Sequence, residues 1–246
     1  MTAGAQGEAR RVAFVLSAAQ AVLGSAAPIC FALGALAGHL MLGPDKSLAT
    51  APLTGYSVGL AVGALPAAWV IRKLGHRDGF LSGAGVSAIG GLIAAIALFH
   101  MSFWGFTFGL SIVGFGNAFV QQFRFAAADS APPEFKARAI SLVLAGGIVT
   151  AVLGPQTVIY THDLLAPVPF AGSFVAIAVL AVVGGAILFL LPARAVVKVH
   201  EAAKDTGRPL IQIVTQPRYA VALVCAVGSY SMMTFVMTGA PLAMVG

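Results

Sequence analysis

Residues 80–99 read FLSGAGVSAIGGLIAAIALF, twenty residues in a row without one charged side chain. A helix that crosses the hydrocarbon core of a bilayer needs about 20 mostly apolar residues. Of all 246 residues in the chain, 59% are apolar and 9% are charged, whereas about a quarter of the residues in a soluble domain are charged. The stretch therefore predicts a membrane-spanning helix, and the composition excludes a soluble globular domain.

Six further apolar blocks lie along the chain, at residues 12–36, 52–71, 101–125, 139–160, 166–192 and 219–242. Blocks of this length exclude the short alternating strands of an outer-membrane barrel. The first block follows Arg10 and Arg11, as the apolar region of a signal peptide would, but it runs well beyond the length of such a region. The predicted fold is all-α, a polytopic transmembrane bundle with seven spans.

The fourteen Lys and Arg residues are distributed unequally between the two sets of loops. Thirteen lie before the first span or close to the connections after the second, fourth and sixth spans, and only Lys46 lies in the other set. Loops rich in Lys and Arg face the cytoplasm, so the N-terminus is predicted to be cytoplasmic and the loops near Lys46, His100 and Asp163 to face outward. This placement explains the formal charge of +6 without a nucleic-acid partner.

The segment from Pro192 to Pro217 is the one long polar interval, and it separates six spans from a seventh. It suits either a helix lying along the membrane surface or an irregular connector. We expect a six-span bundle over residues 1–192, a cytoplasmic connector over 193–217 and a seventh span over 218–246. This pattern is typical of a protein built from two repeated bundles, so the seventh span is expected to begin a second bundle that is mostly absent from this chain.

Three polar residues of the fourth span, Asn117, Gln121 and Arg124, follow one another at the spacing of one helix face. Polar side chains within a span are costly unless they face protein or a wet cavity, so this face is predicted to line a polar path. Gln20 in the first span and Tyr230 in the seventh are predicted to lie on the same path. The alternatives are interhelical hydrogen bonding by the amides and snorkelling of Arg124 to the cytoplasmic boundary.

Glycine and proline mark two further spans. Gly55, Gly59 and Gly63 stand four residues apart in the second span. Small residues at that spacing let two helix backbones approach closely, and ordinary packing is the interpretation that they favour. In the fifth span, Gly154-Pro155 interrupts the backbone hydrogen bonds and predicts a bend, which could gate a cavity.

Groups for ATP use, catalysis or metal binding are not found within the predicted spans. The stretch Gly43-Pro-Asp-Lys-Ser47 lacks the glycine that precedes the Lys of a phosphate-binding loop. All eight Asp and Glu residues and all five His residues fall at span ends or in loops. We therefore expect no intramembrane carboxylate for proton coupling, no catalytic pair, no cofactor and no metal. Cys30 and Cys225 lie in apolar runs and are interpreted as packing residues.

Two stretches of the chain resemble the major facilitator superfamily. Between Gly114 and Pro155, a Gly-x-Gly leads to Asp129, then to Pro132-Pro133 and Arg138, and Gly154-Pro155 is similar to the family's span-five motif. The loop Ala68-Trp-Val-Ile-Arg-Lys-Leu-Gly-His-Arg77 resembles the family's Gly-x3-Asp-Arg-x-Gly-Arg-Arg signature. Gly75 and Arg77 match that signature, and Lys73 is a conservative change. Within the family, the chain resembles the bacterial permeases that include riboflavin-type carriers.

The loop departs from the signature at Arg72, where the family has Asp, and at Ala68, where it has Gly. The resemblance implies that the family's Asp bridges helix ends and holds a cytoplasmic gate closed. Arg72 cannot accept those hydrogen bonds, because a guanidinium only donates. A latch in this chain would therefore be formed differently, through Asp78 or Asp129.

The resemblance implies a transporter, secondary active or facilitative, that moves a small solute across the bacterial cytoplasmic membrane by alternating access and has no enzymatic activity. The alternative is a membrane receptor or structural subunit that carries out no transport. The expected partners are the solute, the lipid bilayer and the second bundle of the same protein. The motif and gating candidates are Arg72, Lys73, Gly75, Arg77, Arg124, Asp129, Arg138, Gly154 and Pro155.

Overall fold

The computed structural model describes residues 3–42, 47–192 and 215–243, and every regular element within these ranges is an α-helix. Seven segments of the described chain are long and apolar enough to cross a membrane, since α1 with α2 and α5 with α6 each form one of them. The predicted all-α bundle with seven spans is confirmed. The helices are α1 Ala3–Leu23, α2 Ala26–Met41, α3 Ala51–Leu74, α4 His76–Phe99, α5 Phe103–Val120, α6 Phe123–Asp129, α7 Lys136–Thr161, α8 Ala171–Leu188 and α10 Pro217–Ala243.

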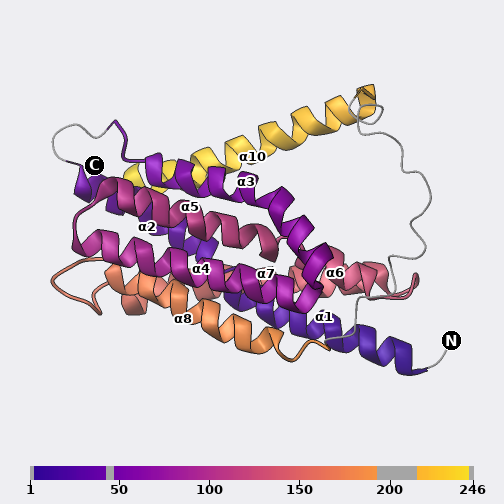
Figure 1. Ribbon diagram of the computed structural model, residues 1–246. Coiled ribbons are helices and arrows are strands. Elements are labelled where there is room, and N and C mark those ends of the chain that lie inside the picture. The colour runs from indigo at the N-terminus through magenta and orange to yellow at the C-terminus, as the bar shows by residue number, and fades with distance from the viewer. Residues whose placement is uncertain (1–2, 43–46, 193–214, 244–246) are drawn as a thin grey trace. The chain divides into compact units, whose positions relative to one another are not determined.

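The chain divides into two compact units, Met1–Val197 and Lys198–Gly246. Helices α1 to α8 form a bundle in the first unit, and α10 belongs to the second (Figure 1). Most of the predicted connector, residues 193–214, and the loop that contains Lys46 lie outside the described residues. The division at 1–192, 193–217 and 218–246 therefore stays a prediction.

The first span consists of two helices, which meet at Gly24 and Ser25. Pro28 has no N–H, so the carbonyl of Gly24 lacks its usual donor four residues later. It accepts instead from the N–H of Ala27, at 3.1 Å. The hydroxyl of Ser25 donates to the carbonyl of Ala21 at 2.7 Å. The predicted first span over 12–36 lies within the single segment Gly7–Met41 that is long and apolar enough to cross a membrane, and Pro28 accounts for the interruption inside it.

The fourth span is also interrupted, at Gln121 and Gln122 between α5 and α6. The N–H of Gln122 donates to the carbonyl of Phe119 at 3.0 Å, three residues back instead of four. Such a tighter turn is common where one helix gives way to another. Phe103–Asp129 still forms one segment of membrane-spanning length, as predicted for the fourth span, but the interruption places Asn117 and Arg124 on different helices.

Helices α3 and α5 pack through their backbones. A Cβ atom built on Gly59 of α3 would lie 1.9 Å from the carbonyl oxygen of Ser111, and one built on Gly114 of α5 would lie 2.0 Å from that of Tyr56. Only glycine fits at such an approach. Gly55 and Gly63 also face α5, so the structure bears out the packing interpretation of this glycine stripe.

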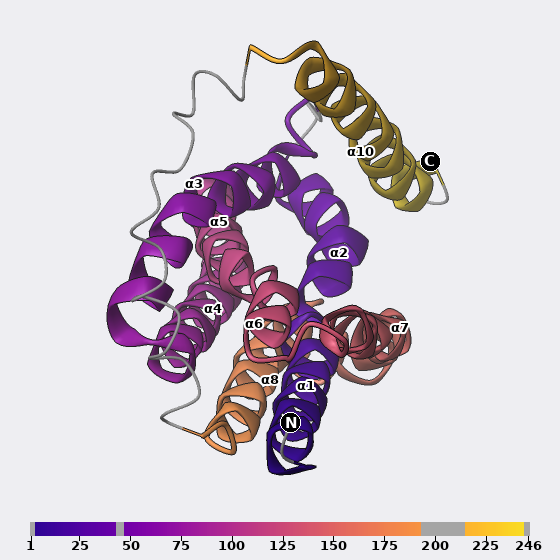
Figure 2. The ribbon, with the colours of Figure 1, turned by 90° about the vertical axis from the view of Figure 1, so that its right-hand side faces the viewer.

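Close glycine contacts also join α1 and α2 to α7, to the backbone of α1 and to a side chain of α2. A Cβ on Gly146 would lie 2.3 Å from the carbonyl oxygen of Ser17, and one on Gly154 would lie 2.4 Å from the ring of Pro28. Figure 2, which looks along the helices, shows α7 beside α1 and α2, and α4 beside α5. Glycine contacts thus tie the fifth span to the first and the second span to the fourth.

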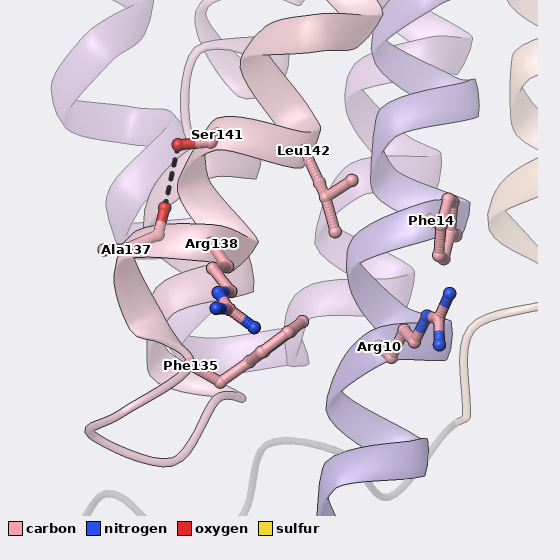
Figure 3. Close-up of a pocket in the computed structure, with 7 residues that line it drawn as sticks. All are labelled: Arg10, Phe14, Phe135, Ala137, Arg138, Ser141 and Leu142. Atoms are coloured by element: carbon pink, nitrogen blue, oxygen red, sulfur yellow. Dashed lines mark hydrogen bonds between the residues drawn. The ribbon is translucent and has the colours of Figure 1, made fainter.

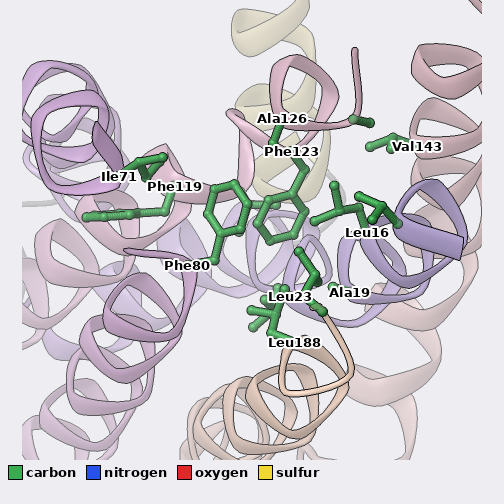
Figure 4. Packing of buried hydrophobic residues seen from close by; sticks show 14 of the residues in the cluster. Leu16, Ala19, Leu23, Ile71, Phe80, Phe119, Phe123, Ala126, Val143 and Leu188 are labelled. Atoms are coloured by element: carbon green, nitrogen blue, oxygen red, sulfur yellow. The ribbon is translucent and has the colours of Figure 1, made fainter. Parts of the chain in front are cut away.

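Large apolar side chains fill the space where α1, α4, α6 and α8 meet (Figure 4). Phe80 of α4 and Phe123 of α6 are buried, and their rings stack edge to face with centroids 4.6 Å apart. Leu16 of α1 and Leu188 of α8 are completely buried in the same cluster. The cluster therefore anchors the short helix α6 immediately after the interruption of the fourth span.

Candidate functional site

Asn117 of α5 is the most deeply buried of the predicted path residues, with 4% of its surface exposed. Its side-chain amide donates a hydrogen bond to the hydroxyl of Tyr56 on α3. The ring of Tyr56 packs edge to face on Phe31 of α2, with centroids 5.7 Å apart. Asn117 therefore links α3 to α5, as the alternative of interhelical hydrogen bonding requires, and its place on a solute path stays a prediction.

Gln121 and Arg124 differ from Asn117 in that their side chains are exposed. Gln121 is the residue at which α5 ends, and Arg124 lies beyond the interruption, in α6. The guanidinium of Arg124 lies over the ring of Phe125, 4.9 Å from its centroid. The expected row on one continuous helix is thus divided into one buried amide and two exposed side chains.

Gln20 lies where α1 meets α7. The hydroxyl of Thr150 on α7 donates to the backbone carbonyl of Gln20 at 3.0 Å. The side-chain nitrogen of Gln20 and the hydroxyl of Thr150 both lie 3.0 Å from the position that a Cβ would take on Gly24. The half-buried Gln20 amide therefore stays beside the junction of the two helices, and the absence of a side chain on Gly24 leaves room for it.

The signature-like loop forms the abrupt turn between α3 and α4. Gly75 ends one helix and begins the next with φ +89°, a conformation that favours glycine. Arg72 and Lys73 are exposed, and the ammonium of Lys73 lies 5.0 Å from the ring centroid of Trp69. Arg77 lies 5.0 Å from the ring centroid of Phe189, just after α8. The turn therefore carries three cations, of which Arg77 packs against the end of the sixth span.

His76 next to this turn was not singled out from the sequence, although it occupies a position where the family signature has Arg. Its ring packs edge to face on Phe80, with centroids 5.6 Å apart. Its Nδ1 and the Nε of Arg77 are buried and have no hydrogen-bond partner among the described residues. Asp129, at the end of α6, lies near enough to interact with His76 electrostatically. Asp129 is one of the two carboxylates considered for a latch, and this interaction brings it within reach of the α3–α4 turn.

The remaining candidates lie on α7 and α10. Helix α7 continues through Gly154 and the exposed Pro155 to Thr161 as one element. Gly154 lies against the ring of Pro28, where a side chain would not fit. Arg138 is exposed in the first turn of α7. Tyr230 lies on α10, in the second unit, where its carbonyl accepts from the hydroxyl of Thr234 at 2.9 Å.

Helices α3 and α7 are the least buried spans of the bundle. Only 28% of the α3 segment and 17% of the α7 segment are buried, against at least half of each other span in the first unit. Val62, Leu65 and Trp69 on α3 are among the exposed side chains, as are Ile148 and Val152 on α7. Apolar faces of this size need lipid or a further protein surface to cover them.

The chain belongs to the major facilitator superfamily, which it matches over residues 12–245. It is 46% identical over 238 residues to the riboflavin transporter RfnT of Brucella anthropi, an alignment that covers 97% of this chain and 60% of that protein. It is 31% identical over 211 residues to the uncharacterized MFS-type transporter YdeG of Bacillus subtilis, covering 80% of this chain and 48% of YdeG. The chain thus spans between about half and 60% of the length of these curated relatives. No solved structure gives a significant match.

Proposed function

We propose that this chain is the N-terminal part of a transporter that moves riboflavin, or a closely similar uncharged heteroaromatic solute, across the bacterial cytoplasmic membrane by alternating access. The observation that carries the proposal is the 46% identity to a riboflavin transporter over 97% of the chain. The proposal assigns transport to the chain and no catalysis. Membership of the superfamily and seven segments of membrane-spanning length are consistent with it.

The chemistry of the spans suits an uncharged solute. All Asp and Glu residues fall at span ends or in loops, so a cationic solute would find no carboxylate to neutralise it within the membrane. The half-buried Gln20 amide can both donate and accept hydrogen bonds. The ring system of riboflavin carries carbonyl and N–H groups along one edge, and such an edge pairs with an amide. We propose that Gln20, Asn117, Gln121 and Tyr230 contribute to its path.

The orientation proposed has the start of α1, the α3–α4 turn and the α6–α7 connection in the cytoplasm. These three regions lie at one end of the bundle (Figure 1). They carry basic residues, among them Arg10, Arg72, Arg77 and Arg138. An excess of Lys and Arg marks cytoplasmic loops, and this excess supports a cytoplasmic N-terminus.

We further propose that the α3–α4 turn and Asp129 belong to a cytoplasmic gate that a second bundle completes. Arg72 and Lys73 are exposed at this end, and Asp129 lies within electrostatic reach of His76. In this arrangement Asp129 takes the part that an Asp at position 72 has in the family signature. Gly75 makes this turn abrupt, and His76, which follows it, is the residue of the turn within electrostatic reach of Asp129.

The test is uptake of radiolabelled riboflavin by bacteria that can neither make nor import it and that express the intact protein. The proposal predicts uptake well above that of an empty vector and growth on low external riboflavin. Excess unlabelled riboflavin should suppress the signal, whereas an unrelated sugar should not. No uptake from a protein that immunodetection finds in the membrane would refute the assignment of riboflavin.

A further inference from the structure

A basic groove opens between α1 and α7 at the end of the bundle where both helices begin (Figure 3). Its volume is about 620 Å³. Figure 3 shows Arg10 and Phe14 of α1 on one side and residues around the first turns of α7 on the other. The residues that line it and bear on its chemistry are Arg10, Phe14, Phe135, Arg138, Ser141 and Leu142.

The groove lies nearer the starts of α1 and α7 than a close backbone contact between them. Their backbones meet at Ser17 and Gly146, where no side chain fits between them. About two helical turns nearer the start of each helix, the facing positions carry Arg10 and Arg138. Both arginines line the groove, Arg10 from α1 and Arg138 from α7.

The groove concentrates positive charge without a paired anion. Among the described residues, the ion pair joins His162 to Asp163. Neither Arg10 nor Arg138 takes part in an ion pair within that described part of the chain. The first turn of α7 includes Arg138 and has no acidic residue. It also lies at the positive end of the helix dipole, which adds to the positive potential. Glu8 and Glu134 are the nearby carboxylates in the sequence, against Arg10, Arg11, Lys136 and Arg138. An anion from outside the chain would therefore be stabilised here.

Two guanidiniums favour a phosphate in particular. Each presents N–H groups in a planar fork that matches two phosphate oxygens. The guanidinium of Arg10 lies 5.6 Å from the ring centroid of Phe14, so the aromatic ring stands directly beside the cation. This pairing of a cation with an exposed apolar surface suits a ligand that is charged at one end and apolar beyond it.

Exposed apolar residues continue from the groove along α7. Ala145, Val149 and Val152 follow Arg138 by 7, 11 and 14 residues, the spacing of one helix face, and all three are exposed. A soluble phosphate would gain nothing from this surface, whereas an acyl chain would cover it. We propose that the groove binds an anionic phospholipid, with its phosphate between Arg10 and Arg138 and an acyl chain along Phe14 and this face of α7.

The test is native mass spectrometry of the intact, delipidated protein titrated with phosphatidylglycerol in detergent. The lipid should bind at least several-fold more tightly than phosphatidylcholine, whose choline cation repels the second arginine. A basic residue near an anionic lipid contributes about fivefold to the affinity, so Arg10→Gln and Arg138→Gln should each weaken phosphatidylglycerol binding by about that factor. Arg10→Lys and Arg138→Lys should retain part of the affinity, and thermal unfolding identifies any variant that is misfolded.

Matched control variants distinguish lipid binding in the groove from general attraction to the basic surface around it. Arg11→Gln and Lys136→Gln each remove one charge next to a groove residue without lining the groove, and they should change the affinity less than twofold. Losses equal to those of Arg10→Gln and Arg138→Gln would overturn the proposal in favour of general surface attraction. Equal binding of phosphatidylcholine would overturn it too, and so would displacement of the lipid by millimolar inorganic phosphate, which would identify a site for a soluble anion.

Discussion

Replacing Gly59 by Ala tests whether α3 and α5 touch through their backbones. The added Cβ would lie 1.9 Å from the carbonyl oxygen of Ser111, and real Cβ atoms essentially never approach a heavy atom closer than 3.0 Å. The two helices must therefore separate locally by about 1.1 Å. A shift along the helix axes gives little relief, because Gly114 makes a contact of the same kind with Tyr56 in the opposite direction.

The expected loss of stability follows from two opposing effects. Forcing an extra carbon into a packed interior costs about 1–3 kcal/mol, and the upper end applies because a backbone carbonyl cannot rotate away. Ala favours the helix over Gly by about 0.5–1 kcal/mol, which leaves a net destabilisation of about 2 kcal/mol. For a chain of this size the midpoint of thermal unfolding should fall by about 4–8 °C.

The measurement is the unfolding midpoint of the intact protein in detergent, taken from size-exclusion profiles after heating. Gly85→Ala on α4 is the matched control, since Gly85 is exposed and an added Cβ there would meet nothing within 4 Å. Its midpoint should stay unchanged or rise slightly. Equal midpoints for Gly59→Ala and Gly85→Ala would refute the close packing of α3 on α5.

Two further predictions concern the polar side chains of the bundle. Tyr56→Phe should destabilise the protein by about 1–3 kcal/mol, because the buried amide of Asn117 loses its acceptor. Adding Asn117→Leu should restore part of that loss, and strictly additive unfolding midpoints in the double-mutant cycle would contradict the bond. Gln20→Leu and Gln121→Leu should each lower riboflavin uptake about tenfold or more with an unchanged unfolding midpoint. Normal uptake by either variant would remove that residue from the proposed path.

The span limits could be predicted from the sequence because the thickness of the bilayer fixes the length of an apolar block. The block at 52–71, for example, lies within the helix Ala51–Leu74. The interruption at Gly24 could have been anticipated, since Pro28 removes the donor that the Gly24 carbonyl would need. The interruption at Gln121 has no comparable signal in the sequence. It depends on how α6 packs through Phe123 against Phe80 of another span.

The site was harder to predict than the fold because its contacts join distant parts of the chain. The Gly55–Gly63 stripe identified which face of its span packs closely, but nothing in the sequence identified α5 as the neighbour. Without knowing that α3 packs against α5, one could not tell from the sequence that Tyr56 reaches Asn117, 61 residues away. A buried amide was thus predicted to face a polar path, although a tyrosine hydroxyl already occupies one of its hydrogen-bonding groups.

The glycine contacts also bear on how a transporter of this family could change access. Gly146 against Ser17 and Gly59 against Ser111 leave no space for a side chain between the paired helices. Sliding either pair by one residue would bring the Cβ of a neighbour into the place that the glycine leaves open. Tightly packed interfaces of this kind hold discrete arrangements and do not deform continuously. We therefore expect α1 to α8 to move as one body, so that access changes by rocking of this bundle against a second one.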